Sequence, residues 1–161
     1  MATDAQRTRV WEDWLSAEIR SYYFADLAFR LESHQRAAHW LILFGASGVV
    51  TSLLSTLPRW VALVLAGLVT AVSIYSVVVQ NQKRAADAKD LHFRWSTLAS
   101  EYHDLWDSIE TAPDLTRAIQ QLDLRKAEAS RSAVALPAEE KRLGHWYDVV
   151  LAQHGLAQQP S

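Results

Sequence analysis

The chain of 161 residues contains no cysteine and few residues that interrupt a helix. Without cysteine it can form neither a disulfide nor a thiolate metal site. Only five glycines and four prolines are present, and neither type occurs before Gly45. The formal net charge of −2 is near neutral, so the composition does not favour nucleic acid as a partner. These absences predict an all-α fold without strands.

Charged residues are also missing from two apolar runs, residues 40–57 and 60–80. As a helix, each run would span roughly 27–30 Å, which matches the hydrocarbon thickness of a bilayer. The Pro-Arg pair at residues 58–59 leaves room only for a tight turn, so the two helices would be antiparallel. We therefore expect a transmembrane helical hairpin. The alternative is a hairpin buried within a helical protein.

The basic residues around this hairpin predict its orientation. Arg30 and Arg36 precede the first run, Lys83 and Arg84 follow the second, and the turn holds only Arg59. Basic residues favour the cytoplasmic side of a membrane. We expect a multi-pass protein of the bacterial inner membrane with both termini in the cytoplasm.

Helical periodicity continues on both sides of the hairpin. The N-terminal amphipathic helix has a broad apolar face, and we expect it to pack on the later helices rather than lie on a membrane surface. After residue 80, apolar residues follow spacings of four and three, which indicates a packed seam. These seam residues are Leu91, Trp95, Leu98, Tyr102, Leu105 and Ile109. The predicted parts are residues 1–39, the hairpin 40–80, the region 81–155 with helices 81–111, 114–132 and 137–154, and a flexible tail 156–161.

Small and hydroxyl side chains form a stripe in the first apolar run and recur in the second. Such a stripe permits close packing of membrane helices, and it could also line a pore. The run contains no acid or base, which argues against a proton relay. The candidate pore-lining or packing residues are Ser47, Gly48, Thr51, Ser52, Ser55, Thr70 and Ser73.

Catalytic and metal-binding motifs are absent. The six histidines show no HExxH spacing, so we interpret them as surface or packing residues. No nucleotide-binding glycine loop or nucleophile motif occurs, and we expect neither an enzyme nor a bound cofactor or metal. Basic residues at Arg117, Arg125, Lys126 and Arg131 could contact phosphate or a nucleotide if subunits formed a ring, or could simply aid solubility. The charged residues 139–142 are interpreted as solvated helix surface.

The arrangement resembles the SLATT family of bacterial two-transmembrane effectors. The residues that carry the resemblance are the SHQRAAHW entry to the first run, the short Pro-containing turn and the NQKRAADAKD exit after the second. It covers about residues 10 to 155. The resemblance implies an effector of anti-phage defence that works beside nucleotide second-messenger sensors, oligomerises and forms pores.

Together with these patterns, the resemblance implies a homo-oligomeric pore former that disrupts the inner membrane when a nucleotide or a sensor releases it. The expected partners are the lipid bilayer, further copies of the chain (a tetramer would suit paired hairpins), and a cyclic oligonucleotide or a nucleotide-synthesising sensor protein. The alternative function is a non-conducting two-transmembrane scaffold that recruits partners through its cytoplasmic helices.

Overall fold

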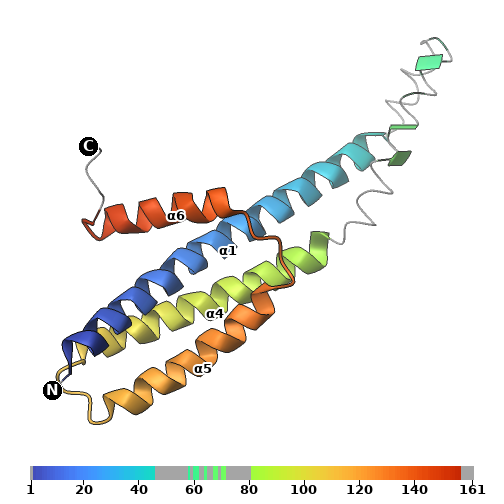
Figure 1. Cartoon of the computed structure of the whole chain (residues 1–161). Coiled ribbons are helices and arrows are strands. Elements are labelled where there is room, and N and C mark those ends of the chain that lie inside the picture. The colour runs from blue at the N-terminus through green and yellow to red at the C-terminus, as the bar shows by residue number, and fades with distance from the viewer. Residues whose placement is uncertain are drawn as a thin grey trace. The chain divides into compact units, whose positions relative to one another are not determined.

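The computed structural model describes residues 2–45, 58, 60–61, 64, 67–68, 70–71 and 81–156. Helices account for most of these residues, and none of them lies in a strand, which confirms the all-α prediction for the described part. The helices are α1 (Asp4–Gly45), α4 (Asn81–Asp107), α5 (Leu115–Ala133) and α6 (Glu140–Gln153) (Figure 1). The chain divides into two compact units, one of residues Met1–Leu27 with Asp87–Ser161 and one of Ala28–Ala86.

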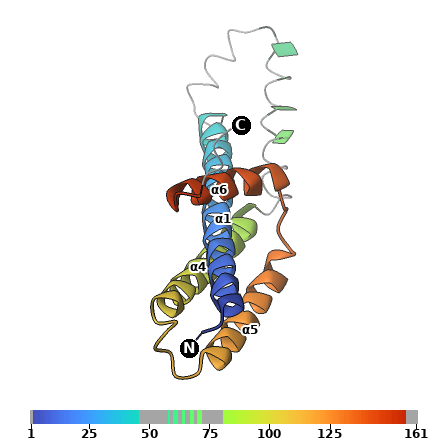
Figure 2. The same cartoon turned by 60° about the vertical axis from the view of Figure 1, so that its left-hand side comes forward.

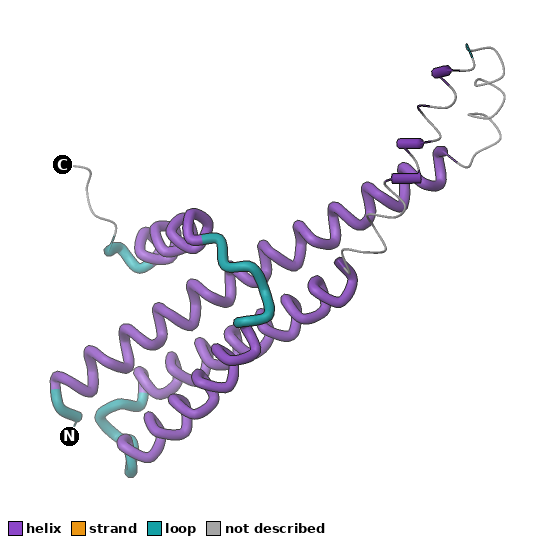
Figure 3. The backbone as a smooth tube through the Cα atoms, turned by 45° about the vertical axis from the view of Figure 1, so that its right-hand side comes forward, coloured by secondary structure: helices purple, strands orange, loops and turns teal. Residues whose placement is uncertain are grey.

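The first unit is built on the N-terminal half of α1, which packs with α4 and α5. Ion pairs join α1 to both neighbours, from Arg7 to Glu110 just after α4 and from Arg9 to Asp123 on α5. The contacts occur in opposite order along α1 and α4, so these two helices are antiparallel. They occur in the same order along α1 and α5, so these two are parallel. Short loops connect α4 to α5 and α5 to α6 (Figure 3). The N-terminal helix therefore packs on the later helices, as its apolar face predicts.

The seam predicted after residue 80 forms the centre of this unit. All of its members are buried, and two of them, Trp95 and Tyr102, are completely inaccessible to solvent. On the facing side of α1, Val10 and Ala17 are also completely buried. Because large aromatic side chains bury the most apolar area, this seam contributes much of the stability of the bundle.

The turn between α4 and α5 follows local sequence signals. Pro113 disfavours helical geometry at Ala112, and the side chain of Asp114 then accepts a hydrogen bond from the Arg117 backbone N–H at 3.1 Å. This N-cap satisfies one of the free donors at the start of α5.

Helix α6 lies across α1 on its other side (Figure 2) and ends in a glycine cap. Gly155 has φ +71°, its N–H bonds to the Ala152 carbonyl, and the Leu156 N–H bonds to the Leu151 carbonyl. This is a Schellman motif. The helix begins at Glu140 rather than near Pro137, because the Tyr23 hydroxyl holds the preceding segment in a non-helical path.

The predicted membrane hairpin is not supported. In the described part of the chain, no helix has a sufficiently long apolar stretch to cross a bilayer. Charged residues continue along α1 as far as Arg36, so within Asp4–Gly45 only residues 40–45 belong to the predicted apolar run, whereas a span needs about 20 apolar residues. The predictions of a membrane protein with transmembrane helices, of a pore-forming ion channel, and of an inner-membrane location are therefore corrected. Residues 46–57 and 72–80 of the proposed hairpin lie outside the described residues.

Candidate functional site

A concave surface of the first unit lies between α1 and α6. This α1–α6 groove has a volume of about 530 Å³ and is mainly apolar. Leu15 and Ile19 line it from α1, and Leu143, Tyr147 and Leu151 line it from α6. The remaining lining residues are Glu12, Ser16, Arg20 and Gly144. The volume lies within the range of ordinary ligand and side-chain pockets.

The groove keeps its shape because α6 is attached to α1 at both ends. At one end, His154 Nε2 lies 2.8 Å from the Glu18 carboxylate. At the other, the Arg142 guanidinium lies 3.2 Å from Asp26, so residues 139–142 are more than a solvated surface. Between these ion pairs, Val150 is completely buried against Leu15 and Ile19.

The segment that leads into α6 is also fixed to α1. The Tyr23 hydroxyl donates to the Pro137 carbonyl at 2.9 Å and accepts from the Glu139 N–H at 3.1 Å. Nearby, the Tyr22 and Trp146 rings stack with centroids 5.5 Å apart and an interplanar angle of 13°. Tyr23 thus positions the α5–α6 connection, while Tyr22 packs against α6 itself.

Beyond the His154 end of the groove, aromatic rings pack closely together. The Trp14 ring stacks on His103 at 4.7 Å and meets His154 edge-on at 5.0 Å. Trp11 contacts Trp106 at 5.2 Å and His154 at 5.5 Å. These contacts fit the interpretation of both histidines as packing residues. In the described ranges, no three His, Cys, Asp or Glu side chains gather in a way that could hold a metal ion.

Arg20 is the unusual charged residue of the groove. Its guanidinium carbon lies 4.8 Å from the centroid of the buried Trp95 ring, a cation–π arrangement. Burial lowers the pKa of Arg20, since removal of water disfavours its charged form. Among the residues that the structure describes, no carboxylate pairs with Arg20, and no basic side chain pairs with Glu12. The groove therefore holds one cation and one anion that other groups leave unneutralised.

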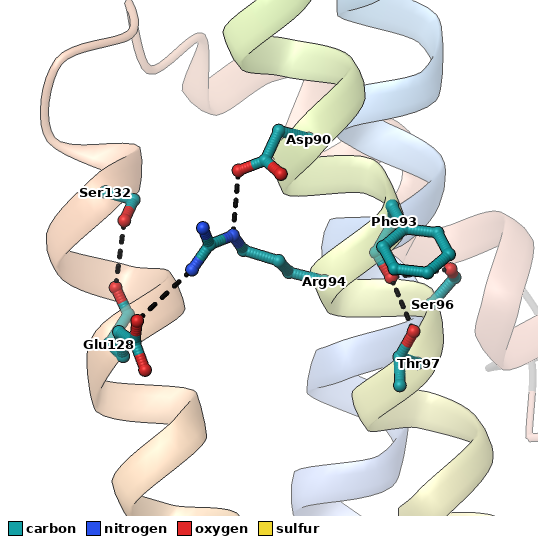
Figure 4. Close-up of polar contacts among 7 residues, drawn as sticks. All are labelled: Asp90, Phe93, Arg94, Ser96, Thr97, Glu128 and Ser132. Carbon is teal, nitrogen blue, oxygen red and sulfur yellow. Dashed lines mark hydrogen bonds and ion pairs between the residues drawn. The ribbon is translucent and has the colours of Figure 1, made fainter.

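The opposite side of the unit, between α4 and α5, carries paired charges. Figure 4 shows Arg94 extending from α4 between Asp90 at 2.7 Å and Glu128 of α5 at 3.3 Å. The hydrogen bond and charge of Asp90, together with Glu128, raise the pKa of Arg94. The hydroxyls of Ser96 and Thr97 both donate to the Phe93 carbonyl at 2.9 Å. This face is polar, and Arg94 is paired with a carboxylate on each helix.

The basic residues predicted to contact phosphate do not converge within one copy. Arg125 pairs with Glu101 and Lys126 pairs with Asp13. Arg117 and Arg131 are exposed and lie fourteen residues apart on α5, about 21 Å along the helix axis. The phosphate site stays a prediction.

Of the predicted pore-lining residues, only Thr70 is described, as an exposed helical residue. Ser47, Gly48, Thr51, Ser52, Ser55 and Ser73 lie outside the described residues.

Sequence reasoning did not identify Glu12 and Arg20 as a pair. The available signal was their spacing of eight residues with Ser16 between them, which places all three on one face of a helix. Comparisons of the chain with protein-family models, with curated proteins and with solved structures find no match.

Proposed function

We propose that this chain is a non-catalytic, self-associating effector of bacterial anti-phage defence that acts as a helical scaffold. The defence role comes from the resemblance to the SLATT family. The mode of action comes from the α1–α6 groove, which has the properties of a protein-binding surface and no catalytic group that we can identify among its lining residues.

The observation that carries the proposal is the incomplete burial of α6. Leu143 and Tyr147 lie one helical turn apart on the rim of the groove and are 39% and 52% exposed. The groove beneath them is lined by Leu15, Ile19 and Leu151. Tyrosine is enriched among the residues that dominate binding energy, and helices commonly dock in apolar grooves.

The experiment measures protection of bacteria that express the chain together with its adjoining genes. We expect the double variant Leu143→Ser, Tyr147→Ser to lose at least about tenfold of the protection, measured as plaquing efficiency, because association would lose its apolar contacts. The matched control is Leu124→Ser on α5, which removes an exposed apolar side chain outside the groove. Circular dichroism verifies that both variants are folded. Equal protection by the groove variant and the wild type, or no protection by the wild type, would contradict the proposal.

A nucleotide signal remains a second element of the proposal. Because Arg117 and Arg131 are exposed and Arg125 and Lys126 face carboxylates, a cyclic oligonucleotide would be held by exposed arginines from more than one copy. Calorimetric titration with cyclic dinucleotides tests this interpretation. We expect Arg117→Ala with Arg131→Ala to abolish binding and Arg36→Ala, outside this helix, to leave it unchanged. Absence of heat with the wild type would instead favour a sensor protein as the source of the signal.

A further inference from the structure

The α1–α6 groove contains a charge pattern that fits a second copy of itself. Glu12 and Arg20 are the charged residues that line it, and they lie eight residues apart on α1, about 12 Å along the helix axis. Ser16, Leu15 and Ile19 lie between them and give an uncharged middle. The other polar residues that join α1 to α6 already contact one another, Glu18 with His154 and Asp26 with Arg142.

We infer that two copies of the chain pair through their α1–α6 grooves about a twofold axis, with Arg20 of each copy facing Glu12 of the other. In a twofold interface, the same patch is used on both sides, so a contact from Arg20 to Glu12 is repeated as a contact from Glu12 to Arg20. An antiparallel arrangement of the two α1 segments brings these charges together twice. It also places the exposed rims formed by Leu143 and Tyr147 against the partner.

The position of Arg20 strengthens this pairing. It is partly removed from water and positioned over the Trp95 ring, yet no carboxylate neutralises it among the described residues. An arginine in that situation gains from an incoming acid, because part of its desolvation has already occurred and its side chain is already ordered. Glu12 is exposed on the same face and can supply that acid from the second copy.

This inference rests on the proposed association of the chain, and it is tested by charge exchange in the purified full-length protein. Analytical ultracentrifugation measures the dimer dissociation constant of wild type, Glu12→Arg, Arg20→Glu and the double variant. We expect each single variant to weaken the dimer at least about tenfold, because it places like charges opposite one another. The double variant restores the dimer, since the charges are exchanged on both copies.

A mixture of the single variants gives the most selective result. Copies with Glu12→Arg carry two cations in the groove, copies with Arg20→Glu carry two anions, and a one-to-one mixture should form a heterodimer although each variant alone is monomeric. The matched control is Asp104→Arg, which makes the same change of charge on α4 outside the groove and should leave the dimer intact. Circular dichroism tests the fold of Arg20→Glu. If that variant unfolds, two measurements replace the mixture: the dimer dissociation constant of Glu12→Arg against that of the wild type, and the dependence of the wild-type constant on ionic strength. The wild-type dimer should weaken as the salt concentration rises.

A monomeric wild type, a dimer insensitive to both single changes, or a mixture that stays monomeric overturns the inference. These outcomes indicate another occupant of the groove, such as a different protein. They can be distinguished from failure of the proposed function. If the wild type forms no dimer but the Leu143 and Tyr147 variant still loses protection, the groove binds a different partner. A twofold dimer in cells that gain no protection leaves the interface valid and removes the defence role.

Discussion

Helices α4 and α6 both carry apolar residues at helical spacing, but they use them differently. In α4 these residues fall on one seam, and every member from Leu91 to Leu105 is buried. In α6 only Val150 is buried, while Leu143 and Tyr147 remain partly exposed. The difference teaches that apolar periodicity identifies a helix face but does not say whether the protein itself covers that face.

The two helices are also attached by different forces. The seam of α4 is held by burial of large side chains, whereas α6 depends on a small apolar contact and on the ion pairs with Glu18 and Asp26. Partly exposed ion pairs contribute little individually, about 0–1 kcal/mol each. We therefore expect α6 to be the less stable of the two helices, and the following variants test that contrast from the largest expected effect to the smallest.

Removal of the central aromatic residue should affect the whole bundle. Trp95→Ala creates a cavity where the side chain is fully buried, and we expect the free energy of unfolding to fall by about 3–5 kcal/mol. Urea denaturation followed by circular dichroism measures the change. Phe93→Ala, two residues away on the same helix and 69% exposed, serves as the control and should have a much smaller effect.

Removal of the apolar anchor of α6 should loosen that helix alone. Val150→Ala should cost about 2 kcal/mol locally, because it deletes buried methyl groups against Leu15 and Ile19. Hydrogen exchange should become faster for α6 amides and remain unchanged for α4 amides. Val134→Ala makes the same substitution at an 84% exposed position and should change neither. Equal acceleration in both helices would contradict the separate stability of α6.

One buried polar atom of the α4 seam lowers the free energy of unfolding, and a substitution can remove it. The Tyr102 hydroxyl is buried without a hydrogen-bond partner among the described residues, so Tyr102→Phe should raise the free energy of unfolding by about 1 kcal/mol. Burial, followed by the charges of Asp13 and Asp123, raises the pKa of Tyr102.

The raised pKa of Tyr102 also predicts a dependence on pH. The folded protein keeps the neutral phenol, while the unfolded chain releases its proton near pH 10, so this contribution to stability is complete below about pH 10 and is lost above it. Denaturation measured from pH 8 to 11 should show a smaller alkaline loss in Tyr102→Phe than in the wild type.

The smallest expected effect is a gain of stability in α6. Gly144 lies within this helix, and a Cβ added there meets no atom within 4 Å, so Gly144→Ala should stabilise α6 by about 0.5–1 kcal/mol. Slower exchange of α6 amides measures the gain. Gly155→Ala is the opposite control, because φ is +71° at that position and an alanine there would be strained.

Much of the bundle could be predicted because its signals are local. The spacing of Trp95, Leu98 and Tyr102 identified the buried seam. Such features depend on residues within one or two turns of one another, so a single sequence contains them. The prediction of a membrane hairpin was wrong: in the part of the chain that the structure describes, no helix is long and apolar enough to cross a bilayer.

The α1–α6 groove could not be predicted, because its parts come from opposite ends of the chain. Glu18 meets His154, and Asp26 meets Arg142, across more than a hundred residues of sequence. No local pattern specifies which helix will cover which face of α1. By itself the sequence determined an all-helical chain with a buried seam; only the tertiary structure decided that Glu12 and Arg20 share an open apolar groove, since burial and charge pairing depend on neighbours that packing alone brings together.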